Sequence, residues 1–161
     1  MKAFAVISVL VLLACLIGVG YVYMTAHIVV EGVGVVATEA VNQPETFADV
    51  KEQIASGQVL GTAYVAPTEL SSPEDYQFLT YTVRLTNNCF VTADMVEVQI
   101  TPMTGDVMQL ASETPKVIKS RETDDIHATI LTDASMHPVR EITVSYYIWG
   151  MPFTLRTTYG Y

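Results

Sequence analysis

The side chains that could carry chemistry are few in this chain of 161 residues, and they are widely separated. The three histidines, His27, His127 and His137, do not have the spacing of zinc ligands. Asp124 and Asp125 lie close to His127 and could offer oxygens to calcium, but the alternating Asp-x-Asp-x-Asp-Gly pattern of a calcium loop is missing. We therefore expect no resident metal ion and no cofactor.

Nucleophilic catalysis would need a serine or cysteine activated by a neighbouring base. Cys89 has no histidine near it in the sequence, and no Gly-x-Ser-x-Gly segment is present. Acidic neighbours such as Glu74 and Asp75 fall in a stretch rich in proline and serine, where solvated carboxylates are the ordinary finding. The sequence therefore predicts a protein that is not an enzyme.

The two cysteines do not indicate a disulfide. Cys15 lies within a hydrophobic segment and Cys89 lies in the polar part of the chain, so the two should sit at different depths. Cys89 is either a buried small hydrophobic residue or a thiol that links two copies of the chain. Cys15 follows Leu12-Leu13-Ala14, which resembles the lipobox of bacterial lipoproteins, so Cys15 is a candidate for lipidation.

Aromatic residues concentrate near the C-terminus, and they suggest either a core or a recognition surface. Tryptophan and tyrosine dominate the energetic centres of protein interfaces. On that ground we take Tyr147, Trp149 and Tyr161 as candidate partner-binding residues, although aromatic residues also fill cores. The full set comprises Tyr146, Tyr147, Trp149, Phe153, Tyr159 and Tyr161.

The net charge of −9 excludes some partners. An acidic surface repels phosphates, and no basic patch with interleaved aromatic residues is present, so we expect no nucleic-acid binding. Anionic lipid headgroups are repelled in the same way, so the folded part should not lie flat on a bilayer. Lys116, Lys119 and Arg121 form a short positive cluster, but acidic residues follow at once, which is typical of a solvated loop.

Residues 1–25 predict a transmembrane signal-anchor helix. No formal charge occurs from Ala3 to Met24, and as a helix this run reaches about 30 Å, the thickness of a hydrocarbon core. Lys2 precedes the run, so the N-terminus is expected in the cytoplasm and the rest of the chain outside it. One alternative is a cleaved signal peptide, which usually has a shorter apolar core. The other is the lipoprotein signal, whose cysteine is usually followed by polar residues.

Residues 26–57 predict a membrane-proximal segment with two elements. His27 to Val41 is rich in valine and indicates a strand or an extended stalk that leaves the membrane. Pro44 to Ser56 predicts a short amphipathic helix, because Phe47, Val50 and Ile54 recur at helical spacing among polar residues. We expect this helix to pack on a sheet.

Residues 58–161 predict a mainly β domain. Apolar and polar residues alternate in short runs, most clearly from Arg140 to Trp149, and polar turns separate the runs. About seven such strands, each with one wet and one dry face, predict an antiparallel β-sandwich. The expected strands are 59–65, 76–86, 95–101, 107–110, 126–132, 140–149 and 153–159, with a polar connection at 113–125.

One pair of expected strands resembles a known family. The run Tyr81-Thr82-Val83-Arg84-Leu85-Thr86-Asn87-Asn88, followed by Val96-Glu97-Val98-Gln99-Ile100, is similar to adjacent strands of membrane-anchored, immunoglobulin-like surface domains of bacteria and archaea. The later run from Ile126 to Leu131 resembles their strand after a polar connection. The resemblance implies an immunoglobulin-like sandwich and a non-catalytic binding or assembly role.

These patterns together predict a membrane-tethered protein-interaction or assembly module outside the cytoplasm. Its expected partner is another protein or a second copy of the chain. One alternative is a subunit of a cell-envelope machine or surface filament, similar to a stator or a pilin, in which the N-terminal helix packs with other helices. Another is a small-ligand carrier with a pocket between its sheets.

Overall fold

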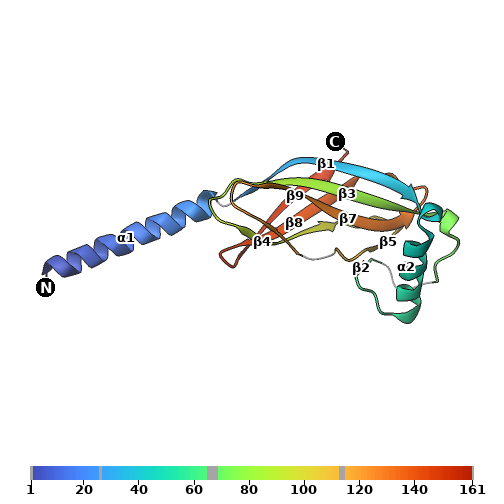
Figure 1. Cartoon of the computed structure of the whole chain (residues 1–161), viewed down its shortest axis with the longest axis horizontal. Helices are drawn as coiled ribbons and strands as arrows, with labels where there is room; N and C mark the ends of the chain where they lie inside the picture. The colour runs from blue at the N-terminus through green and yellow to red at the C-terminus, as the bar shows by residue number, and fades with distance from the viewer. Residues whose placement is uncertain (1, 26, 65–68, 113–114, 161) are drawn as a thin grey trace.

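A single helix projects from one end of a two-layer body (Figure 1). The computed structural model describes residues 2–25, 27–64, 69–112 and 115–160. Helix α1 (Lys2–Thr25) has exposed side chains along nearly its whole length, and it is long and apolar enough to cross a membrane. Within lipid the backbone groups of such a segment are satisfied by the helix itself.

The body is a mainly β, antiparallel sandwich, as the alternating pattern predicts. The larger sheet has the strand order β1-β3-β7-β5-β2, and the smaller sheet has the order β6-β4-β8-β9. The larger sheet contains β1 (Ile28–Glu39), β2 (Thr62–Ala63), β3 (Tyr76–Asn87), β5 (Asp106–Gln109) and β7 (Thr123–Asp133). The smaller sheet contains β4 (Ala93–Ile100), β6 (Lys116–Ile118), β8 (Arg140–Ile148) and β9 (Met151–Tyr159).

The core lies between the two sheets and follows the period-two pattern. Tyr81, Val83 and Leu85 of β3 are buried, and so are alternate residues of β8 such as Ile142 and Val144. Their neighbours in sequence point to solvent, because successive side chains of a strand face opposite sides. Each sheet therefore has one dry face, and the two dry faces cover each other.

Helix α2 (Pro44–Ser56) closes the end of the body far from α1 (Figure 1). Its bounds confirm the expected helix, and Phe47, Val50 and Ile54 are buried in a second cluster with residues of β3, β5 and β7. The helix ends at Gly57, whose φ of 69° lies in the left-handed region that glycine adopts without strain. A 3-10 turn, η1 (Ala40–Asn42), joins β1 to α2, and another, η2 (Pro73–Asp75), precedes β3.

In three segments the observed strands differ from those expected from the sequence, or decide between the alternatives that the sequence left open. The valine-rich segment is a strand rather than a stalk, because β1 pairs with β3 along its length. The expected connection at 113–125 contains β6, which pairs with β4, and β7 begins at Thr123 rather than at Ile126. The expected strand at 59–65 is reduced to Thr62 and Ala63 within the described residues, and Val65 lies outside them.

A buried ion pair joins the two sheets near α2. The guanidinium of Arg140, on β8, donates from Nε and Nη2 to both carboxylate oxygens of Asp106, on β5, at 2.9 and 2.7 Å. Both side chains are fully buried. Arg140 also donates to the carbonyl oxygens of His137 and Val139, and the Asp106 carboxylate accepts the Met103 N–H. Paired and hydrogen-bonded in this way, the two charges avoid the large cost of isolated burial.

We predict that Asp106→Asn destabilises the fold by about 3–5 kcal/mol near neutral pH, because it leaves the Arg140 charge buried without a counter-ion. Burial acts to raise the pKa of the Asp106 carboxyl, but hydrogen bonds from Arg140 and Met103 outweigh it and hold that pKa below its usual value. The contribution of Asp106 is therefore present above pH of about 4 and is lost as the pH falls toward the depressed pKa. Denaturant unfolding across this pH range measures it.

Asp125→Asn is the matched control, because Asp125 forms an exposed bidentate pair with Arg84 at 2.8 Å. Exposed pairs contribute little, so this variant should unfold almost like the wild type. Equal effects of the two substitutions would contradict the role assigned to the buried pair.

Candidate functional site

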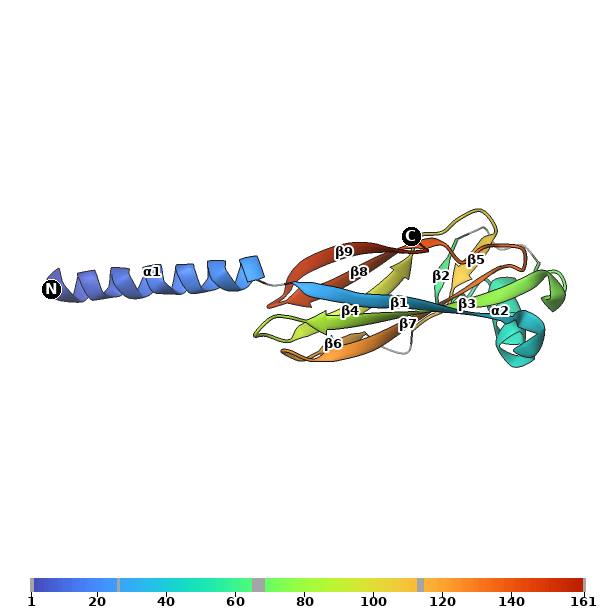
Figure 2. The same ribbon diagram turned by 90° about the horizontal axis from the view of Figure 1, so that it is seen from above.

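The last turn of α1 contacts the end of the sandwich that it enters. The ring of Tyr23 lies 5.7 Å from the ring of Phe153 on β9, centroid to centroid. The thiol of Cys89 donates to the carbonyl oxygen of Thr25 at 3.2 Å. We call this end of the body the α1-proximal end; it comprises the turns at residues 88–92, 119–122 and 149–150 (Figure 2).

The start of β1 is fastened to the smaller sheet at the same end. The backbone N–H of Ile28 donates to the phenol oxygen of Tyr146 at 3.3 Å. The Tyr146 ring stacks on Phe153 at 5.5 Å with an interplanar angle of 12°. Burial raises the pKa of the Tyr146 phenol, so it stays neutral and can accept this hydrogen bond at any physiological pH. The chain therefore passes from α1 into a packed aromatic cluster.

Asn87, the last residue of β3, organises two of these turns. Its side chain is fully buried, and Nδ2 donates to the carbonyl oxygens of Val91, Ile118 and Lys119 at 2.8, 3.0 and 3.1 Å. Its Oδ1 accepts the Cys89 N–H at 2.9 Å. One amide thus satisfies backbone groups of both turns, which would otherwise be buried without partners. In the sequence, Asn87-Asn88 indicates only a turn, because asparagine tolerates left-handed backbone.

The two turns held by Asn87 present Phe90 and Arg121 to the outside. The Phe90 ring is 66% exposed, and the Arg121 guanidinium lies over it, 4.5 Å from the ring centroid. The Arg121 N–H also donates to the Asn87 carbonyl oxygen at 3.0 Å. A guanidinium over an aromatic face is a cation–π contact, which holds both side chains at the surface.

Trp149 occupies the turn between β8 and β9. Ile148 pairs with Met151, so Trp149 and Gly150 form a two-residue hairpin turn, and their φ angles are 53° and 74°. Positive φ at both central positions defines a type I′ turn, in which Asn-Gly is the preferred sequence. Trp149 is 55% exposed, so it is held in a strained backbone conformation without the compensation of burial.

The three candidate partner-binding residues do not form one patch in the described residues. Trp149 lies in the hairpin turn, and Tyr147 lies on the outer face of β8, opposite Asp94 of β4 and Pro152 of β9. Tyr161 lies outside the described residues. Tyr146 is buried in the core. Outside α1, all exposed aromatic side chains of the described residues are at this end: Phe90, Tyr147 and Trp149.

The two cysteines occupy different environments, as expected from their positions. Cys15 is exposed in the middle of α1, where helix continues on both sides. Cys89 is 1% exposed, and burial raises the pKa of its thiol. Burial favours the first of the two alternatives for Cys89, a small core residue, because a covered thiol does not reach a second copy of the chain.

The sandwich is open along one side, where β1 and β9 lie side by side (Figure 2). A groove of about 440 Å³ separates them, and its lining includes Val30, Val33 and Tyr159. We call this groove with its two flanking strands the seam. Six core-facing hydrophobic residues of the two strands are only partly buried there: Val30, Val33, Val35, Phe153, Leu155 and Tyr159.

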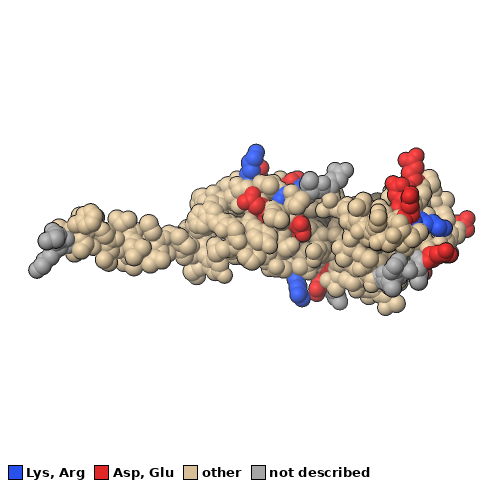
Figure 3. All heavy atoms as spheres, turned by 90° about the horizontal axis from the view of Figure 1, so that it is seen from below, with Lys and Arg blue, Asp and Glu red and all other residues tan. Residues whose placement is uncertain are grey.

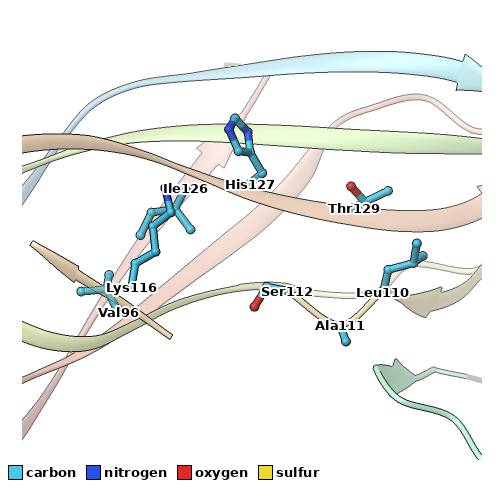
Figure 4. A pocket seen from close by; sticks show the side chains of 8 residues that line it. All are labelled: Val96, Leu110, Ala111, Ser112, Lys116, Ile126, His127 and Thr129. Atoms are coloured by element: carbon cyan, nitrogen blue, oxygen red, sulfur yellow. The ribbon is translucent and has the colours of Figure 1, made fainter. Parts of the chain in front are cut away.

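A second opening lies on the other side of the sandwich. A cavity of about 320 Å³ is lined by the eight residues labelled in Figure 4, which come from β4, β6, β7 and the segment after β5. Lys116 and His127 are its ionisable residues. The Lys116 ammonium is already bound to the Asp125 carbonyl oxygen at 2.7 Å, and His127 Nδ1 is bonded to Thr82 Oγ1 at 2.9 Å. These side chains hold strands together.

Charged residues are unevenly distributed. Acidic side chains gather at the end of the molecule far from α1 (Figure 3), where α2 and η2 carry Glu45, Asp49, Glu52, Glu74 and Asp75. No group of three histidine, cysteine or carboxylate side chains in the described residues could hold a metal ion. The acidic side chains at this end therefore form a negative surface, but among the described residues they do not converge on a metal site.

No protein-family model matches the chain, and no curated protein or solved structure matches it either.

We predict that Trp149→Asn increases the free energy of unfolding by about 1 kcal/mol, because asparagine adopts the left-handed conformation more readily than tryptophan. Thermal unfolding in detergent measures the change. Tyr147→Asn, two residues before Trp149 on the regular backbone of β8, is the control and should not stabilise the protein. A loss of stability in Trp149→Asn would show that the indole supports the fold.

We also predict that a thiol-reactive reagent modifies Cys15 but not Cys89 in the detergent-solubilised protein, because the Cys89 thiol is covered. Peptide mass analysis after alkylation measures both sites, and unfolding in guanidinium should make Cys89 reactive. Equal modification of the two cysteines in the folded protein would contradict the burial of Cys89.

Proposed function

We propose that this chain is a non-catalytic module for protein interaction or assembly, tethered to a membrane by α1 with its sandwich outside the cytoplasm. The length and apolar character of α1 support the tether. The two-layer antiparallel architecture supports a relationship to immunoglobulin-like surface domains, in which binding rather than catalysis is the common role. The single observation that carries the proposed binding role is the seam between β1 and β9.

The seam offers two unpaired strand edges to one occupant. β1 and β9 each end the order of their own sheet in the described residues, so alternate backbone N–H and C=O groups point away from the sheet. The other two edges, β2 and β6, have only two and three residues, whereas β1 has twelve and β9 has nine. Long open edges are templates for pairing with another strand.

The side chains at the seam favour an extended, apolar segment as the occupant. β1 has a bulge at Glu31, which changes which residues face the core. These are Ile28 and Val30 before the bulge and Val33 and Val35 after it. Both sets stay against the core, yet Val30, Val33 and Val35 remain partly exposed. An added strand would gain backbone hydrogen bonds from an edge and bury this apolar surface, which is the β-augmentation mode of peptide recognition.

We predict that Thr158→Pro weakens binding at the seam by up to about tenfold. Ile148 and Met151 form the hydrogen-bonded pair that closes the hairpin, so every second residue of β9 from Met151 onward is hydrogen-bonded to β8. Thr158 lies between two such residues, and its backbone N–H therefore points away from β8. Proline removes that donor and leaves the β8–β9 ladder intact. Thr158→Ala keeps the donor and is the matched control.

A photo-cross-linking residue at Thr154 provides the measurement, because Thr154 points outward on the same strand. In native membranes it should give an adduct that Thr158→Pro reduces and Thr158→Ala does not. A cross-linker at the exposed Asp49 on α2 gives the background. Equal adducts at both sites, or adducts unaffected by proline, would contradict the proposed role of the seam.

The mass of the adduct separates the two kinds of assembly. An adduct of two copies of this chain supports a filament or envelope-machine subunit, in which one copy supplies the strand that fills the seam of the next. An adduct with a different protein supports a tethered interaction module. Both outcomes use the same edge.

A further inference from the structure

We infer that the α1-proximal end is a second membrane contact, in which Phe90 and Trp149 enter the interfacial layer of the bilayer that α1 spans and Arg121 meets the lipid phosphates. This inference rests on the tether in the proposed function, but it does not depend on the seam or on any protein partner. The occupant is a lipid surface.

The turns of the α1-proximal end are held close to the end of α1. Only two residues separate the end of α1 at Thr25 from the start of β1 at Ile28, so the body cannot stand away from the helix. The contacts of Tyr23 with Phe153 and of Cys89 with Thr25 fix the same end of the sandwich against the last turn of α1. The turns therefore lie at the end of the body that α1 enters (Figure 1). In the proposed tether, this is the level at which α1 leaves the lipid.

The exposed side chains of these turns have the chemistry of a membrane interface. Phe90 and Trp149 are among the few exposed large apolar side chains of the body, and they sit on separate turns at this one end. Tryptophan and tyrosine are enriched at both membrane–water interfaces, and Tyr21 and Tyr23 provide that belt on α1 itself. Phe90 and Trp149 extend the belt sideways from α1 onto the body.

Backbone strain is concentrated at the same end. Three non-glycine residues have positive φ in the described residues: Met95 at 49°, Arg121 at 63° and Trp149 at 53°. All three are exposed, and all three lie in the turns or in the bulge of β4 at this end. Strained residues gather where the side chain serves a contact rather than the fold.

The distribution of charge also favours contact with lipid headgroups. Arg121 lies over Phe90, so an inserted ring would place the guanidinium beside the headgroup phosphates. Glu122, the residue after Arg121, lies 3.9 Å from the Lys119 ammonium, which offsets its charge. The acidic side chains of α2 and η2 lie at the opposite end (Figure 3), so an end-on orientation keeps them away from an anionic bilayer.

Trp149 is the only tryptophan in the chain, so its fluorescence reports this contact directly. The full chain is reconstituted into phosphatidylcholine–phosphatidylglycerol vesicles that contain a lipid with a nitroxide close to the headgroup. We expect the nitroxide lipid to quench Trp149 strongly and aqueous iodide to quench it weakly. The reference is Leu60→Trp in a Trp149→Phe background, because Leu60 is 77% exposed at the far end; its quenching pattern should be the reverse.

A fluorophore on Cys15 reports the insertion of α1 independently, because Cys89 is buried and stays unlabelled. If Cys15 is in lipid but iodide quenches Trp149 as strongly as the Leu60→Trp reference, the membrane contact is wrong and the tether stands. If Cys15 is also outside the lipid, the tether and the membrane contact are both wrong. Trp149 exposed in vesicles but shielded in native membranes would assign the turns to a protein partner and overturn the inference.

Discussion

The contact between the last turn of α1 and the sandwich sets the orientation of the whole protein. Tyr23 on Phe153, the Cys89 thiol on the Thr25 carbonyl, and the short connection to β1 leave the body little freedom to turn about the helix. If α1 crosses a bilayer, the turns around Phe90 and Trp149 face the lipid. The seam then runs away from the membrane, because β1 starts beside α1 and ends at α2.

The two ends of the sandwich are held by different buried polar groups. Near α2, the Arg140–Asp106 pair connects β8 in one sheet to β5 in the other. Near α1, the amide of Asn87 connects the turns that follow β3 and β6. No buried side-chain nitrogen or oxygen in the described residues is without a hydrogen-bond partner. Satisfied networks of this kind specify one arrangement of the surrounding chain, so the turns and the seam have defined shapes.

Local patterns were sufficient for the elements that bury one regular face. Helix α2 was predicted with its observed bounds, because apolar residues at helical spacing lie between an N-terminal proline and Gly57. The alternation in β3 and β8 predicted which of their residues are buried. In both cases residues close together in the sequence carry the whole signal.

The remaining features depend on which strands become neighbours, and a single sequence does not contain that information in local form. The three residues of β6 are too few to show an alternating pattern of apolar and polar residues, and they form a strand because β4 lies beside them. The aromatic residues near the C-terminus suggested a recognition surface, but only the contact of Tyr23 with Phe153 shows that the hairpin of Trp149 lies at the end that α1 enters. The valine-rich run indicated a strand or stalk, but not that Val33 and Val35 are partly exposed because β1 and β9 have no further neighbour in the described residues.

The most direct test of this account is a short-range cross-link between α1 and the body in native membranes. A variant with Tyr23→Cys, Phe153→Cys and Cys15→Ser is treated with a short bifunctional thiol reagent, and the bridged peptides are identified by mass. The account predicts one intramolecular bridge between residues 23 and 153, in a chain that retains α1. A mature protein that lacks α1, or a retained α1 that forms no such bridge, would contradict it.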